Sequence, residues 1–212
     1  MTKTQPVQES DCNLSVCKIS AEFKLPSKQP LVSQLHISLL ESSPLIWRRV
    51  LVPSGITLGT LHKVLQVVMG WEDCHSHEYL FDGEAYTVPD PDIEFGRTLR
   101  DERRKKLSSL LKSENDTLRY LYDPGDGWVH AVTLEKILPE EKSLKTPRCI
   151  EGEGACPPEN CGGISGYAEL LKVLDDPDHP HYREKRAWAG GRFDPGRFDP
   201  KVVNRRLAEK GA

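Results

Sequence analysis

Short segments in which apolar and polar residues alternate, separated by turn-forming residues, set the strongest limit on the fold of this chain. In LVSQLHISLL, Leu35, Ile37 and Leu39 occupy every second position, and PLIWRRVLVP continues in the same style after Ser43 and Pro44. Alternation with a period of two places apolar side chains on one face of a β-strand. The two segments therefore predict a pair of antiparallel strands.

Two further pairs of alternating segments flank tight turns. HEYLFDGEAYTV is divided by Asp82 and Gly83, and TLRYLYDPGDGWVHAVTLEKIL is divided by residues 124–127. Aspartate and glycine accept the positive φ angles that short hairpin turns require. Each pair is predicted to form a β-hairpin.

Helical spacing is clearest in LGTLHKVLQVVM, where Leu58, Leu61 and Leu65 recur at intervals of three and four residues. Thr57 stands where an N-cap belongs, and Gly70 stands where a left-handed C-cap belongs. This segment predicts an amphipathic α-helix with both ends defined.

Three other segments are predicted to be helical. The charged run RTLRDERRKKLSSLLKS carries leucines on one helical face at 107, 110 and 111. GYAELLKVL follows Ser165, a candidate N-cap, and PKVVNRRLAEK begins with Asp199 as N-cap and Pro200 at the first helical position. The end of the chain is therefore expected to be helical.

Length and composition favour one α+β domain. The chain has 212 residues, 37% hydrophobic and 29% charged, which is enough to bury a core. Residues 1–30 are rich in Lys, Gln, Ser and Pro, so we expect a flexible N-terminal arm, with the folded domain and its helical tail in residues 31–212. The net charge of −3 gives no global attraction to nucleic acid or to a membrane.

Cellular location follows from what the sequence lacks. The first residues have no continuous apolar core of a signal peptide, and no apolar run approaches the roughly 20 residues of a membrane span. We therefore expect a cytoplasmic protein with no membrane partner. In a reducing compartment, the six cysteines are expected to be thiols or metal ligands rather than disulfides.

Six ordered motifs together resemble a known family. They are PLIWRRVLVP, LHKVLQVVMGW, HSHEYLF, YDPGDGWVH, GEGACPPENCGGISGY and FDPKVVNRRL, and they run from about Leu31 to Leu207. The chain resembles the Ri-plasmid open-reading-frame-three-like family, which includes proteins labelled as passenger resolvase-like products of insertion elements. The resemblance implies an α+β domain with a curved antiparallel sheet and helices packed against it. It implies no activity, and no motif here resembles the serine or tyrosine chemistry of a recombinase.

Three cysteines form the first candidate site. Cys149, Cys156 and Cys161 lie on one segment that is predicted to be irregular, and a tetrahedral zinc ion could take three thiolates from it and a histidine from elsewhere. The prolines and paired glycines of ACPPENCGG equally fit a rigid corner with buried cysteines. Both interpretations stay open.

Histidines and aspartates form the second candidate site. His75 and His77 would point to one face of a strand, where imidazoles bind metals or transfer protons, or pack against aromatic rings. Asp126 and His130 near the PGDGW turn, with Asp123, could act as an acid–base pair, but aspartate is also an ordinary turn residue. We expect the histidines, Asp126 and the cysteine loop to meet at one end of the sheet.

Basic residues form a third candidate site. Arg103, Arg104, Lys105 and Lys106 belong to a segment with a local surplus of positive charge, which suits phosphate backbones. A charged face of an amphipathic helix is the plainer interpretation, and no helix-turn-helix or zinc-finger pattern accompanies it.

The leading functional hypothesis is a binding or adaptor module. One end of its sheet would hold a small ligand, a metal such as zinc, or a protein segment, in a cleft lined by Trp71 and Trp128. One alternative is a metal-assisted hydrolase or nuclease that acts on phosphate esters, with Asp126 and the histidines placing the metal. The other is a DNA-associated accessory factor of mobile elements, with nucleic acid as its partner.

Overall fold

The computed structural model describes Met1 and residues 31–89, 98–139, 144 and 146–211. Apart from Met1, the arm predicted for residues 1–30 lies outside the described residues. The rest forms one α+β domain in which eight strands make a single sheet.

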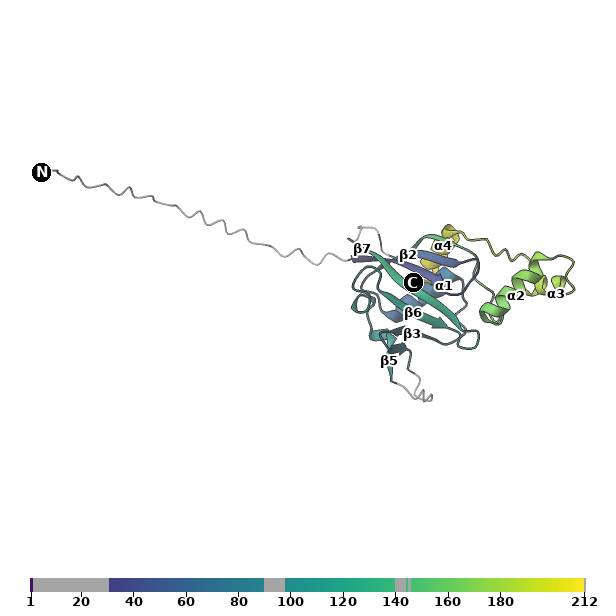
Figure 1. The fold of residues 1–212 in the computed structure, drawn as a ribbon, viewed down its shortest axis with the longest axis horizontal. Helices are drawn as coiled ribbons and strands as arrows, with labels where there is room; N and C mark the ends of the chain where they lie inside the picture. Colours follow the sequence, from purple (N-terminus) through teal and green to yellow (C-terminus); the bar gives the residue numbers. More distant parts are fainter. Residues whose placement is uncertain (2–30, 90–97, 140–143, 145, 212) are drawn as a thin grey trace.

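The sheet is antiparallel except at one edge. Its strands lie in the order β5-β4-β3-β6-β7-β1-β2-β8, and only β4 and β5 run parallel. The bounds are β1 (Leu31–Leu39), β2 (Ile46–Pro53), β3 (His77–Phe81), β4 (Glu84–Thr87), β5 (Leu99–Asp101), β6 (Thr117–Tyr122), β7 (Trp128–Pro139) and β8 (Arg148–Glu153). In this strand order β7 lies next to β1, so the sheet continues from β3, β6 and β7 into β1 and β2 (Figure 1).

The predicted strand pairs are confirmed. β1 and β2 pair from Leu39 with Ile46 to Val32 with Pro53, and the alternating apolar residues of β1 are buried. The β3–β4 hairpin turns at Asp82 and Gly83, both with positive φ, as the dipeptide requires. The β6–β7 hairpin turns through residues 123–127.

The described residues contain four α-helices, two of which lie against the sheet. Their bounds are α1 (Leu58–Met69), α2 (Gly163–Asp175), α3 (Tyr182–Trp188) and α4 (Pro200–Lys210). In α1 the Thr57 side chain accepts a hydrogen bond from the backbone N–H of Thr60, and Gly70 ends the helix with a φ of 108°. Both predicted caps of α1 are confirmed, as is the start of α4 at Asp199 and Pro200. Figure 1 shows α1 and α4 against the sheet, whereas α2 and α3 extend away from it.

The helix predicted for the charged segment is wrong. Residues 99–109 form β5 and two 3-10 turns, η1 (Glu102–Arg104) and η2 (Leu107–Ser109). The backbone here bonds to the start of α1: Leu58 N–H donates to the Lys105 carbonyl, and Leu107 N–H donates to the Ile56 carbonyl. Because these groups are bonded elsewhere, they cannot build an α-helical ladder, although Leu107 is buried as its spacing predicted.

Two further local predictions need correction. Cys149 lies within strand β8 rather than in an irregular segment. Ser165 is inside α2 and does not cap it, because the helix begins two residues earlier, after Gly162 in a left-handed conformation. Gly163 lies so close to the Asp126 carbonyl that a Cβ would have no room there. The paired glycines thus join the start of α2 to the β6–β7 turn.

Among the described residues, no helix combines the length and the apolar character needed to cross a bilayer.

Candidate metal centre

Three potential metal ligands converge at one end of the sheet. Cys74 and His75 lie in the loop between α1 and β3, and Glu159 lies in the loop between β8 and α2. One ligand atom from each side chain lies within 4.8 Å of the other two. Within residues 31–89, 98–139, 144 and 146–211, this is the one group of three or more Cys, His, Asp or Glu side chains that meets this distance.

Two of these ligand atoms are buried and have no hydrogen-bond partner. They are His75 Nε2 and Glu159 Oε2, which lie 3.8 Å apart. A second carboxylate oxygen, Asp123 Oδ2, lies 3.6 Å from the same imidazole nitrogen. These separations exceed the 2.7–3.2 Å of an N–H···O hydrogen bond. Two ligands that each lie about 2.0–2.1 Å from one tetrahedral ion would be roughly 3.3 Å apart, so the spacing suits a shared cation.

The carboxylate of Glu159 is held in place by its other oxygen. Glu159 Oε1 accepts hydrogen bonds from the Tyr122 hydroxyl, at 3.0 Å, and from the Glu72 backbone N–H, at 2.8 Å. The same hydroxyl accepts a bond from the Cys74 backbone N–H, at 3.2 Å. Burial raises the pKa of Tyr122, so the hydroxyl keeps its proton and donates it. Tyr122 therefore orients two of the three ligand residues, as outer-shell groups do in metal sites.

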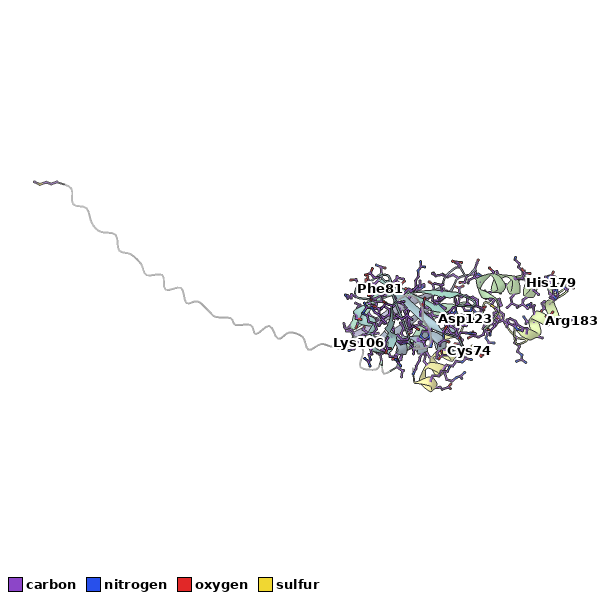
Figure 2. The ribbon with its side chains drawn as sticks, turned by 90° about the horizontal axis from the view of Figure 1, so that it is seen from below. Cys74, Phe81, Lys106, Asp123, His179 and Arg183 are labelled. Atoms are coloured by element: carbon purple, nitrogen blue, oxygen red, sulfur yellow. The ribbon has the colours of Figure 1, made fainter. Side chains whose placement is uncertain are left out.

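Asp123 owes its position to the β6–β7 turn. Its φ of 51° is left-handed, its backbone N–H donates to the Ser76 carbonyl, and its Oδ1 accepts from the Gly125 N–H at 2.9 Å. The other oxygen, Oδ2, faces His75. The aspartate is thus both a turn residue and a neighbour of the centre. Figure 2 shows the labelled Cys74 and Asp123 close to each other in this view.

A cavity of about 570 Å³ lies beside the centre. His75 and His77 both line it. Only His77 belongs to a strand, because β3 begins there and His75 lies in the loop before it, which corrects the expectation that one strand carries both rings. The other lining residues are Thr57, Gly59, Thr60, His62, Lys63, Asp73, Val88, Glu102 and Arg103. This volume is within the range of small-molecule sites.

His77 is bonded into this cavity wall. Its Nε2 lies 2.9 Å from Glu102 Oε2, and its ring stacks on His62 with the centroids 3.5 Å apart. Glu102 is buried, although it belongs to the charged segment.

The structure places His130, Trp71 and Trp128 in the core. All three are buried, and the two tryptophan rings pack 5.2 Å apart. His130 Nε2 accepts from the Trp71 indole N–H at 3.4 Å, and its Nδ1 donates to the Tyr120 carbonyl at 3.3 Å. Burial lowers the pKa of His130 to about 4, so the imidazole is neutral.

Asp126 lies outside the cluster. Its Oδ2 accepts a hydrogen bond of 3.2 Å from the Gly162 N–H. This bond links the hairpin turn to the start of α2, which is a structural contact. Its predicted catalytic role stays a prediction.

The three late cysteines do not form such a cluster. Cys149 is buried in β8, where its backbone pairs with Asn204, whereas Cys156 lies against Gly70 and Cys161 precedes α2. Burial raises the pKa of Cys149 to about 11 and that of Cys161 to about 12, which disfavours free thiolates. Zinc binding by these residues stays a prediction.

The basic residues have local partners. Arg103 makes two hydrogen bonds of 2.9 Å to the Asp101 carboxylate, and Lys105 Nζ lies 5.4 Å above the Tyr86 ring. Arg104 and Lys106 are exposed beside them. Their predicted role in nucleic-acid binding stays a prediction.

Sequence reasoning missed two candidate ligands, Cys74 and Glu159. The available signal for Cys74 was its position next to His75, because thiolate and imidazole are both zinc ligands. Glu159 belongs to the ACPPENCGG loop that was expected to meet the histidines, but nothing in the sequence distinguished this glutamate as a ligand.

A family of known proteins matches most of this chain. Residues 32–202 match the family described as plasmid pRiA4b ORF-3-like protein. The chain therefore belongs to this family, as its six motifs indicated.

Two individual proteins are also similar to this chain. The chain is 38% identical over 160 residues to "Uncharacterized protein y4hQ" of Sinorhizobium fredii (strain NBRC 101917 / NGR234), which covers 75% of this chain and 81% of the relative. It is also 38% identical to the crystal structure of a protein of unknown function, MM3350 from Methanosarcina mazei Go1, with a TM-score of 0.74. That match covers 82% of this chain and 97% of the other, and it supports the same α+β fold. None of the three descriptions mentions a resolvase.

Proposed function

We propose that this protein binds a transition-metal ion of the zinc type at Cys74, His75 and Glu159. The observation that carries the proposal is the pair of buried, unpartnered atoms, His75 Nε2 and Glu159 Oε2, 3.8 Å apart. Buried polar atoms without partners are costly, and an ion would satisfy both. Asp123 is close enough to supply a further carboxylate.

The ligand types select the metal. Zinc and neighbouring transition metals accept sulfur, imidazole nitrogen and carboxylate oxygen in one site. Calcium and magnesium prefer oxygen ligands alone, so they suit this set poorly. Such a metal site would be one example of the ligand- or metal-binding module that we expected from the sequence at one end of the sheet.

Metal analysis of untagged protein tests the proposal. After titration with Zn²⁺ and removal of excess, we expect one ion per chain in the parent and a loss in His75→Ala and Glu159→Gln. Cys161→Ser is the matched control, because this cysteine lies outside the cluster, and it should keep the ion. Retention by His75→Ala together with loss in Cys156→Ser and Cys161→Ser would assign the ion to the cysteine loop instead.

A second candidate function is metal-assisted hydrolysis of phosphate esters. It is favoured by the cavity of about 570 Å³ that His75 lines, because Cys74, His75 and Glu159 leave one coordination position for water or substrate when Asp123 does not bind the ion. A bound metal lowers the pKa of water and so supplies a nucleophile near neutral pH.

A screen of phosphomonoesters and phosphodiesters would test this second candidate. Activity should rise in proportion to the bound zinc and disappear in His75→Ala. Zinc-loaded parent protein that hydrolyses none of these substrates would rule out this chemistry while leaving metal binding intact.

A further inference from the structure

One buried imidazole contacts both flanks of the ligand pair Cys74–His75. His62, on α1, is only 6% exposed. Its Nε2 lies 2.8 Å from Asp73 Oδ1, just before the pair, and its ring stacks on His77, just after it, with an interplanar angle of 3°. The segment that carries two of the three ligands is therefore bound at both ends to the same side chain.

Hydrogen-bond donors fix the proton positions in this contact. The Asp73 backbone N–H donates to Gln66 Oε1 at 2.9 Å, so the Gln66 amide must present Nε2 to the Tyr120 hydroxyl, at 2.9 Å. The hydroxyl accepts that bond and gives its own proton to His62 Nδ1, at 2.8 Å. His62 is then left with its proton on Nε2, which donates to Asp73.

This order defines His62 as a neutral imidazole. A second proton on Nδ1 would face the Tyr120 hydroxyl and leave its O–H without an acceptor. Burial, assisted by the neighbouring His77, lowers the pKa of His62 in agreement with the neutral form. In this arrangement, every hydrogen bond among Gln66, Tyr120, His62 and Asp73 has one donor and one acceptor.

The other flank is fixed in a similar way. The His77 ring lies flat on His62, and its Nε2 is bonded to the buried carboxylate of Glu102.

Asp73 holds a left-handed φ of 57° with half of its side chain exposed, so its position depends on its hydrogen bonds to His62 and Gln66 rather than on burial. A loop held in this manner has fewer conformations to lose when it binds an ion.

We propose that His62 is the positioning residue of the metal centre, which it serves by holding Asp73 and His77 so that Cys74 and His75 face Glu159. This inference rests on the proposed metal binding. His62 itself does not touch the ion, because both of its nitrogens are bonded within the network.

Zinc affinity, measured by competition with a chelator, tests the inference in paired variants. His62→Phe keeps a flat ring but loses both hydrogen bonds, and we expect it to bind Zn²⁺ about 10–100-fold more weakly, as for other outer-shell changes. His62→Gln can restore an N–H donor toward Asp73, so its affinity should lie closer to the parent value. Lys201→Ala, at an exposed position on α4 that does not line the cavity, is the control and should match the parent.

A second pair of variants, at Asp73, tests the same contact if the His62→Phe protein does not fold. Asp73→Asn keeps an acceptor for His62 and tolerates the positive φ, whereas Asp73→Ser keeps a small polar side chain that is too short to reach His62. We expect weaker zinc binding in Asp73→Ser than in Asp73→Asn, with similar unfolding midpoints for the two metal-free proteins.

The outcomes separate the two proposals. Parent protein that binds no zinc would reject the metal centre itself. Parent protein that binds zinc, with equal affinity in Asp73→Ser, Asp73→Asn and a folded His62→Phe, would reject the positioning role alone.

Discussion

At the scale of single residues, Arg48 shows how backbone carbonyls can accept the hydrogen bonds of a buried charge, which also lies 4.0 Å from the Phe198 ring centroid. Its guanidinium donates to the carbonyls of Val68, Trp47, Glu153 and Gly154 at 2.7–2.8 Å. Burial lowers the pKa of Arg48 to about 10, which still leaves it charged at neutral pH. One side chain thus joins β2, the end of α1 and the end of β8.

We expect Arg48→Met to lower the free energy of unfolding by about 3 kcal/mol or more, because it leaves several buried carbonyls unpaired. Arg49→Met is the adjacent control. Arg49 pairs with the partly exposed Glu135 and with Glu151, so its loss should cost about 1 kcal/mol or less. Urea denaturation of both variants measures the difference, and equal losses would contradict this account of Arg48.

His130 predicts a pH dependence. The pKa of its imidazole falls from 6.5 in the unfolded chain to about 4 in the fold, because burial disfavours the charged form. The stability that depends on neutral His130 is therefore complete above pH 6.5 and is lost as the pH falls toward 4. The difference corresponds to about 3 kcal/mol.

Denaturant unfolding across this pH range checks the effect. His130→Gln keeps an acceptor for Trp71 and a donor for the Tyr120 carbonyl, but it does not titrate. The parent should lose more stability than this variant on acidification. Parallel pH profiles would show that another group is responsible.

At the scale of elements, α4 closes the outer edge of the sheet. Among the described residues, β8 pairs with β2 on one side and with no strand on the other. On its other side, the Asn204 amide accepts from the Cys149 N–H at 2.7 Å and donates to the Cys149 carbonyl at 2.8 Å. The side chain thus replaces one residue of a missing neighbouring strand, which protects an edge that would otherwise pair with another chain.

Asn204→Ala should destabilise the protein by about 1–2 kcal/mol, because both backbone groups of Cys149 lose their partner. Lys201→Ala, on the exposed side of the same helix, should have a negligible effect. Thermal unfolding compares the two variants. A destabilisation equal to that of Lys201→Ala would mean that water replaces the amide without loss.

The elements that sequence reasoning identified are those with local signals. α1 and α4 carry cap residues, and the β3–β4 and β6–β7 hairpins carry Asp–Gly turns, so each is specified within a few residues. β8 was missed because its partner β2 lies far earlier in the chain. β5 was missed for another reason: it has only 3 residues, inside a charged run whose leucines follow helical spacing, although its partner β4 is the preceding strand. The leucines of η2 had helical spacing, but tertiary hydrogen bonds decided the backbone.

At the scale of the whole molecule, the candidate centre joins loops that are far apart in the chain. Cys74 and His75 follow α1, Asp123 follows β6, and Glu159 precedes α2. Sequence reasoning expected one group at this end of the sheet, and only one of its members, His75, is among the candidate ligands. The other expected members were His77, Asp126, His130, Cys149, Cys156 and Cys161. The sequence could not predict Glu159, whose orientation depends on the hydroxyl of Tyr122 and on the backbone of Glu72.

Zinc should stabilise the folded chain through this centre. At a free concentration of 100 times the dissociation constant, binding to the native state alone adds about 2.7 kcal/mol. We expect the unfolding temperature of the parent to rise with added Zn²⁺ and that of His75→Ala to stay constant. An equal rise in both proteins would place the stabilising ion elsewhere.

The order of the strands also bears on synthesis. β2 gains its outer neighbour only when β8 arrives, after β3, β6 and β7 have already been made. A nascent chain that has not yet passed Arg148 on the ribosome therefore carries β2 with an open row of amides and carbonyls beside buried valines such as Val50. We expect chains that end before Arg148 to keep this edge and to associate through it, so that the addition of β8 protects the finished chain against aggregation.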